Sequence, residues 1–298
     1  MFENVLVGVD GSPNGRDAIA LAESLTGAGG KITLAHVYVD GLHPLHAVTP
    51  GLVEEERAAS AELLQRERTA AKVQAELLSV VGAAPGAALH RQAEEEDADL
   101  LVVGSCSRGP LGRVMIGDDT RQALNGAPCA VAIASKGYAE DPKPIARIGV
   151  GYNDSAESRA ALEVARRVAA ASDAAIRALE VVSIPTYAYT GLMPPTIGEG
   201  LDVVLEEANK RLRLLEGVQG SAVYGLTGEE LAALGDDVDL LVVGSRSYGP
   251  WRRLVLGSTS DYLERHARCS LLVLPRAAAH EHGEAAQKQA AEGSGAGA

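Results

Sequence analysis

The segment Leu240–Ser247, Leu-Leu-Val-Val-Gly-Ser-Arg-Ser, is a close copy of Leu100–Ser107, Leu-Leu-Val-Val-Gly-Ser-Cys-Ser, which lies 140 residues earlier. Each copy is an apolar run that ends in glycine, as expected for a buried parallel strand that opens into a loop. A Gly-Pro pair and a second glycine, Gly117 or Gly257, follow each strand. The chain is therefore predicted to be a tandem duplication whose repeated unit, a strand, a glycine-bearing loop and a helix, commonly binds anions.

Working outward from this segment, apolar strand patterns alternate with helical patterns in the same order in both copies. This alternation predicts βαβ units, and hence an α/β protein with two tandem, open, parallel-sheet sandwiches of the Rossmann-like kind. The strands expected in the first copy are Val5–Val9, Ile32–Val39, Val73–Val81, Leu100–Val103 and Cys129–Ala134; those in the second are Ile148–Tyr152, Ile176–Val182, Ser221–Tyr224, Leu240–Val243 and Ser270–Leu274.

The domain organisation follows from the same repeat. We expect one domain over residues 1–137, a linker over 138–146 that contains Pro142 and Pro144, and a second domain over 147–276. Residues 277–298, rich in Ala, Gly, Glu and Gln, are predicted to be a disordered tail. In the second copy we expect a loop over Ser183–Gly200 before a helix that begins near Leu201.

Composition narrows the classes of function. A formal net charge of −13 argues against an extended nucleic-acid surface, which needs clustered Lys and Arg. Three cysteines, no signal peptide and no long apolar run indicate a cytoplasmic protein without a membrane segment. Cys129 and Cys269 occupy equivalent positions in the two copies and are expected to be small buried hydrophobic side chains.

The glycine loop of the second copy has the chemistry of a phosphate site. We expect Gly244 to let the chain leave its strand sharply and Gly257 to let the backbone approach a ligand. The hydroxyls of Ser258, Thr259 and Ser260 and the N–H groups of a helix start can then hold phosphate oxygens. Glycines at such a turn can equally serve conformation alone.

These features together resemble the universal stress protein family in its tandem two-domain form. Val7–Ser12 resembles the opening strand and turn of that family, and Leu240–Ser258 resembles its G-x2-G-x9-G-(S/T) motif. Ala127–Cys129 and Leu272–Pro275, around the last strand of each copy, fit as well. The resemblance covers nearly all of the chain except the tail.

The resemblance implies an adenine nucleotide alpha hydrolase-like fold, with five strands per copy in the order 3-2-1-4-5. It also implies ATP or AMP in a cleft between the first and fourth strands, and a stress-response sensor or regulator. The residues that match the ribose and adenine positions are Asp10 and Val37 in copy one and Asn153 and Val181 in copy two. Those that match the phosphate positions are Gly104, Ser107, Gly117, Asp118, Asp119 and Thr120, or Gly244, Ser247, Gly257, Ser258, Thr259 and Ser260.

The two copies depart differently from the motif. Both have serine, Ser107 and Ser247, at a motif glycine, and copy one has Asp118 and Asp119 where hydroxyls are expected. A carboxylate about 4 Å from a phosphate oxygen is repelled by up to about 4 kcal/mol at an effective dielectric of about 20, unless Mg²⁺ bridges them. Copy two keeps its hydroxyls and has Asn153, whose amide still bonds a ribose hydroxyl. Copy two is therefore predicted to be the better nucleotide site.

Other functions stay open at this stage. The alternative is an interaction module with degenerate phosphate loops that recruits a protein partner. No catalytic residue or metal site is predicted, and at most slow ATP hydrolysis is expected. Family members of the tandem form pair their halves through the final strands, Cys129–Ala134 and Ser270–Leu274 here, as an intramolecular pseudo-dimer; a homodimer of chains is also compatible with the sequence.

Overall fold

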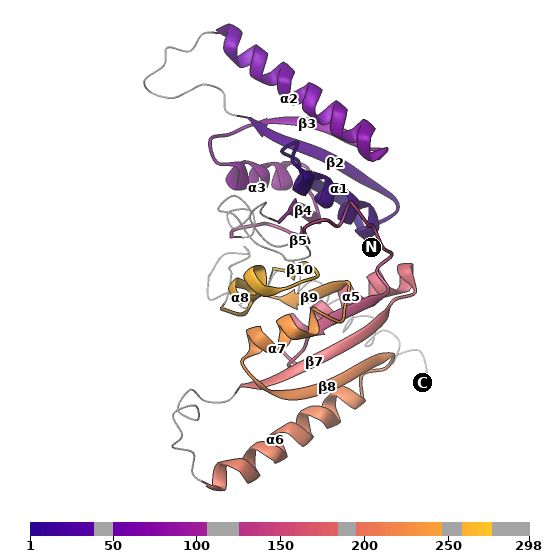
Figure 1. Cartoon of the computed structure of the whole chain (residues 1–298), viewed down its shortest axis with the longest axis vertical. Helices are drawn as coiled ribbons and strands as arrows, with labels where there is room; N and C mark the ends of the chain where they lie inside the picture. The colour runs from indigo at the N-terminus through magenta and orange to yellow at the C-terminus, as the bar shows by residue number, and fades with distance from the viewer. Residues whose placement is uncertain (39–49, 106–124, 184–194, 246–257, 276–298) are drawn as a thin grey trace, which may run out of the picture.

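The computed structural model describes residues 1–38, 50–105, 125–183, 195–245 and 258–275. The chain forms one elongated sheet with helices on both faces (Figure 1). Helices α2 (Pro50–Ala71) and α6 (Pro195–Arg213) lie at the two far ends of the molecule, and the junction between the copies lies in the middle.

The elements alternate along the chain as the sequence predicts. In the first copy they are β1 (Phe2–Gly8), α1 (Pro13–Leu25), β2 (Thr26–Tyr38), α2, β3 (Glu76–Val81), α3 (Pro85–Glu95), β4 (Leu100–Gly104) and β5 (Ala130–Ala134). In the second they are β6 (Arg147–Gly151), α5 (Ala156–Ser172), β7 (Ala175–Ser183), α6, β8 (Val218–Gly225), α7 (Thr227–Leu234), β9 (Leu240–Gly244), α8 (Ser258–His266) and β10 (Ser270–Leu274).

All ten strands belong to one sheet, in the order β3-β2-β1-β4-β5-β10-β9-β6-β7-β8. Each copy therefore contributes five parallel strands in the order 3-2-1-4-5, which confirms the predicted fold class and strand order. The copies join through β5 and β10, which pair antiparallel with Ala132 opposite Leu272. The two five-stranded sheets thus form one continuous ten-stranded sheet, and the strands of the two copies run in opposite directions where they meet.

Two hydrophobic cores fill the two faces of the sheet, and each core contains residues of both copies. One core holds apolar side chains of α1 and α5, together with Leu64 of α2 and Leu212 of α6. The other holds side chains of α3, α7 and α8. Cys129 and Cys269 are buried in the second core, as expected, and burial raises the pKa of each thiol to about 12.

Several predicted boundaries were wrong by a few residues. Helix α6 begins at Pro195, within the stretch predicted to be a loop up to Gly200. Proline is favourable in the first turn of a helix, and an exposed helix tolerates a glycine at a cost of about 1 kcal/mol. Strand β2 begins at Thr26, which pairs with Phe2 of β1. The glycine-rich stretch Thr26–Gly30 has no apolar pattern, so the sequence did not predict this early start. The predicted tail and the two glycine loops lie outside the described residues.

One aspartate in each copy fixes the start of the central strand of that copy. Asp99, just before β4, accepts hydrogen bonds from the backbone N–H groups of Glu3 (2.8 Å) and Asn4 (3.0 Å). Asp239, just before β9, accepts from the N–H groups of Ala146 (3.0 Å) and Arg147 (2.8 Å). The repeated Asp-Leu-Leu-Val-Val-Gly sequence therefore includes a polar contact that helps to set the register of β4 against β1 and of β9 against β6.

The segment between the copies is attached to the first of them by a buried carboxylate. Asp17 on α1 is 2% exposed and accepts hydrogen bonds at 2.8 Å from the backbone N–H groups of Gly137 and Ala139. Burial raises the pKa of Asp17 above its ordinary value of 3.8, although the two N–H groups favour the charged form. The connection between the copies is thus held in place by specific contacts.

Candidate functional site

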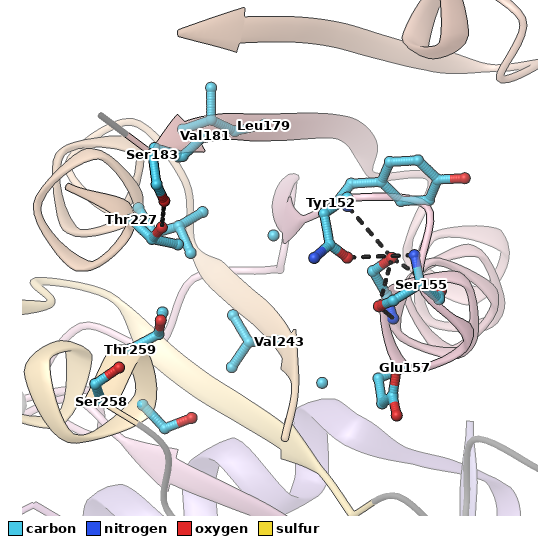
Figure 2. Close-up of a pocket in the computed structure, with 16 residues that line it drawn as sticks. Tyr152, Ser155, Glu157, Leu179, Val181, Ser183, Thr227, Val243, Ser258 and Thr259 are labelled. Atoms are coloured by element: carbon cyan, nitrogen blue, oxygen red, sulfur yellow. Dashed lines mark hydrogen bonds between the residues drawn. The ribbon is translucent and has the colours of Figure 1, made fainter. Parts of the chain in front are cut away.

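A cavity of about 390 Å³ lies in copy two at the carboxyl ends of β6, β7 and β9 (Figure 2). The strand order of the copy reverses between β6 and β9, and ligands of open α/β sheets bind at such a reversal. The cavity is lined by Gly151, Tyr152, Asn153, Ser155, Glu157, Ser158, Leu179, Val181, Ser183, Thr227, Leu231, Val243, Gly244, Ser258, Thr259 and Ser260.

One side of the cavity is formed by the turn between β6 and α5. The Ser155 hydroxyl caps the helix by accepting a hydrogen bond from the N–H group of Ser158 at 3.2 Å. The Asn153 side-chain oxygen accepts from the N–H group of Ser155 at 3.3 Å. Both side chains are thus held by the first turn of α5, whose positive dipole end favours an anion or a polar ligand.

The opposite side carries hydroxyl groups from two further helix starts. Ser258, Thr259 and Ser260 form the first turn of α8. The hydroxyls of Ser183, at the end of β7, and Thr227, at the start of α7, lie 3.2 Å apart and face the cavity from the side away from Ser155 (Figure 2). The starts of α5, α7 and α8 therefore converge on one cavity.

Apolar side chains complete the lining. Leu179 and Val181 come from one face of β7, Val243 from β9 and Leu231 from α7. Leu179 and Val181 precede Ser183 at spacings of two, so one face of β7 changes from apolar to polar along the cavity. The cavity thus combines an apolar wall with polar groups at helix starts, a combination typical of small-molecule sites.

Gly244 is required by close packing and not by an unusual backbone conformation. A Cβ atom at this position would lie 2.7 Å from the backbone oxygen of Glu157, in the first turn of α5. Gly104 has the same role in copy one, where a Cβ atom would lie 2.2 Å from the backbone oxygen of Asn14. Our expectation that the glycine serves a sharp exit from the strand therefore needs correction: it lets the start of the helix touch the strand end.

The structure brings together the described part of the predicted copy-two site. Six of the predicted residues line the cavity: Asn153, Val181, Gly244, Ser258, Thr259 and Ser260. The predicted residues Ser247 and Gly257 lie outside the described residues, as do Ser107, Gly117, Asp118, Asp119 and Thr120 of copy one.

The described part of the copy-one site repeats a backbone contact of copy two. The N–H group of Val9 donates to Ala35 at 2.8 Å, as that of Tyr152 donates to Leu179 at 2.9 Å. Asp10 and Val37 are therefore the structural equivalents of Asn153 and Val181. The copies differ at the helix cap, because the Ser12 hydroxyl donates to Asp10 at 2.6 Å and makes no cap hydrogen bond.

Sequence reasoning missed several polar residues of the cavity, among them Ser183, Thr227 and Glu157. Ser183 could have been found from its spacing of two from Val181 on one strand face. Thr227 carried no sequence signal, because only the crossover of the chain brings the start of α7 beside the end of β7. Glu157 also lines the cavity and puts a carboxylate at the start of α5.

Two further features bear on the chemistry of the site. Burial, together with a 3.0 Å hydrogen bond from its hydroxyl to Asp154, raises the pKa of Tyr152, so this phenol stays protonated at neutral pH. Within the described ranges, no group of three or more His, Cys, Asp or Glu side chains is arranged to hold a metal ion.

None of the described helices is long and apolar enough to cross a membrane.

Two doubly wound halves, joined edge to edge and carrying a cavity at a strand-order reversal, define the chain as a tandem Rossmann-like α/β protein. A family model described as the universal stress protein family matches residues 1–135 and 144–275. The chain therefore belongs to the universal stress protein family, with one family domain in each copy.

Individual relatives agree with this assignment. A universal stress protein of Mycobacterium tuberculosis (strain ATCC 25618 / H37Rv) is 29% identical over 198 residues, which cover 61% of this chain and 66% of the relative, slightly less than two thirds of its length. One from Thermus aquaticus is 28% identical over 144 residues, 45% of this chain and 98% of the relative. A solved universal stress protein from Archaeoglobus fulgidus DSM 4304 covers 92% of this chain and 98% of its own, with 18% identity and a TM-score of 0.64, and shows the same fold.

Proposed function

We propose that the copy-two cavity binds an adenine nucleotide and that the chain acts as a nucleotide-dependent sensor or regulator of the stress response. The observation that carries this proposal is the cavity itself. An apolar wall on β7 and three helix starts meet at the strand-order reversal, in a volume of about 390 Å³. Pockets for small molecules and cofactors commonly have volumes of about 300–1,000 Å³.

Each part of a nucleotide has a suitable counterpart in this cavity. The apolar faces of Leu179 and Val181 suit a base, and Asn153 supplies an amide for a ribose hydroxyl. The phosphates suit the first turn of α8, where Ser258 and Thr259 add hydroxyl donors to the helix N–H groups. The predicted preference for copy two over copy one is retained as part of the proposal.

Glu157 supports the alternative of an interaction module that binds no nucleotide. Glu157 lines the same cavity, and a phosphate placed about 4 Å from its carboxylate would be repelled by up to about 4 kcal/mol at an effective dielectric of about 20. In this proposal Mg²⁺ accompanies ATP, because it is the ion that suits carboxylate and phosphate oxygens. A strong dependence of ATP binding on Mg²⁺, with adenosine unaffected, is expected.

Equilibrium dialysis of the full chain with ATP, AMP, cyclic AMP and adenosine tests the proposal. We expect ATP to bind in the presence of Mg²⁺. Thr259→Val removes one hydroxyl from the phosphate side and should weaken ATP about tenfold or more, because a hydrogen bond to a charged group contributes about 1.5–3 kcal/mol. Adenosine binding should be unchanged. Thr69→Val, on an exposed face of α2, is the matched control.

The outcomes separate the two functions. Binding of none of the four ligands to the wild-type chain would reject the nucleotide proposal in favour of the interaction module. An equal loss of ATP and adenosine binding in Thr259→Val would reject the assignment of the phosphates to α8.

A further inference from the structure

The junction between the copies is built around equivalent positions. Strands β5 and β10 pair antiparallel in the register Val131–Val273, Ala132–Leu272 and Ile133–Leu271. Ala132 and Leu272 are 140 residues apart, the same offset that relates the repeated strands Leu100–Gly104 and Leu240–Gly244. The central pair of the junction is therefore one position of the duplication paired with itself.

Side chains of unequal size meet at this position. Ala132 and Leu272 are both 0% exposed and both belong to the core that contains α1 and α5. Continued by one residue, this register places Ala130 opposite Leu274, again alanine against leucine in the same core. On this face of the sheet, strand β5 contributes only alanines, Ala130, Ala132 and Ala134, whereas β10 contributes two leucines.

Pairing of either copy with an identical copy would lose this fit. Two first copies would place Ala132 against Ala132 and leave a void between them. Two second copies would place Leu272 against Leu272 in the space that now holds one leucine. Protein cores are close-packed, so both a void and an overfilled pair are destabilising.

A hydrogen bond at one end of the junction has the same selectivity. The backbone N–H group of Ser135 donates to the buried hydroxyl of Ser270 at 3.2 Å. The equivalent of Ser270 in copy one is Ala130, which has no hydroxyl. The equivalent of Ser135 in copy two is Pro275, which has no N–H group. Only the pairing of a first copy with a second copy can form this bond.

We infer that the residues on the β5–β10 junction select pairing between the two different copies over pairing between identical copies. The partner of the β5 edge is the second copy of the chain, recognised by small side chains opposite large ones and by the Ser135–Ser270 bond. The consequence is that each first copy is paired with one second copy. This inference concerns assembly and does not depend on nucleotide binding.

A double-mutant cycle on the full chain tests the inference. Ala132→Leu creates the Leu–Leu pair of two second copies, and Leu272→Ala creates the Ala–Ala pair of two first copies. We expect each single variant to lower the urea midpoint. The double variant restores a small–large pair in reversed order and should recover at least half of the summed loss, because contacting residues are energetically coupled.

The control and a milder series keep the test decisive. Leu272→Ala combined with Ala178→Leu, on β7 in the same core, should be additive, because these residues lie on strands that are not neighbours. If the variants fail to fold, Ala132→Val and Leu272→Val replace them with smaller changes of volume. A double variant with a loss equal to or larger than the sum of the two single losses would overturn the inference. So would a urea midpoint of Ala132→Leu equal to that of wild type.

Discussion

The substitution Gly244→Ala tests how the copy-two site is assembled. The new Cβ atom would lie 2.7 Å from the backbone oxygen of Glu157, 2.8 Å from its Cβ and 2.9 Å from its carbonyl carbon. Ordinary contact begins at 3.4 Å, so the start of α5 must move by about 0.7 Å (3.4 − 2.7) away from β9. Backbone atoms cannot rotate away as a flexible side chain can.

The expected cost is that of an overpacked core, about 1–3 kcal/mol. At a urea m-value of about 3 kcal/mol/M, this cost lowers the urea midpoint of unfolding by about 0.3–1 M. The displaced helix start should also weaken ligand binding in the cavity that Gly244 and Glu157 both line. Urea unfolding followed by circular dichroism measures the first effect, and equilibrium dialysis with ATP the second.

Gly200→Ala is the matched control for this prediction. Gly200 lies exposed on α6, and a Cβ atom there would have no neighbour within 4 Å. Alanine in place of an unstrained helical glycine should raise stability by about 0.4–1 kcal/mol. An unchanged or raised midpoint for Gly244→Ala would refute the argument that the glycine is required by the approach of α5.

Three further predictions concern carboxylate and thiol groups. In a Cys106→Ser chain, Cys129 and Cys269 should react with a thiol reagent only after unfolding, because burial raises the pKa of each to about 12; rapid reaction of the native chain would contradict this. Asp17→Asn should lose about 1–3 kcal/mol at pH 7, because the amide leaves one linker N–H group without an acceptor. Burial raises the folded pKa of Asp17 above 3.8, so the native state binds the proton more readily and this group adds stability as pH falls toward that value. The urea midpoint of the asparagine variant should therefore fall more steeply on acidification than that of wild type. Parallel pH curves of the two midpoints would contradict this prediction. Asp239→Ala should lower the unfolding free energy by about 1–2 kcal/mol through the lost strand contacts, and calorimetry showing an unchanged melting temperature would count against it.

The fold was largely predictable because its signals are local and repeated. The apolar runs that begin at Leu100 and Leu240 predict buried parallel strands. The alternation of strands with helices then leaves few possible topologies. The junction through the final strands was predicted from the family resemblance, and the pairing of β5 with β10 confirms it; the structure adds that this pairing is antiparallel. The boundaries of β2 and α6 were not predictable, since glycines there sit in regular elements that tertiary contacts and helix length stabilise.

The site was predictable only where one segment contributes several residues. Ser258, Thr259 and Ser260 are consecutive, so a helix start places them together. Thr227 enters the cavity because the chain crosses over and brings the start of α7 to it, and no sequence spacing encodes that. Glu157 lies only four residues after Asn153, at the start of the helix that directly follows β6. The reason for Gly244 likewise depends on a helix that is distant in sequence.

The equivalent residues Val181 and Val37 provide the most direct test of the claim that copy two holds the nucleotide. Isothermal titration of the full chain with ATP and Mg²⁺ should be compared for wild type, Val181→Phe and Val37→Phe. We predict one molecule of ATP bound per chain, binding weakened about tenfold or more when phenylalanine fills the copy-two cavity, and no change for Val37→Phe. Loss of binding in Val37→Phe with full binding retained in Val181→Phe would contradict the account.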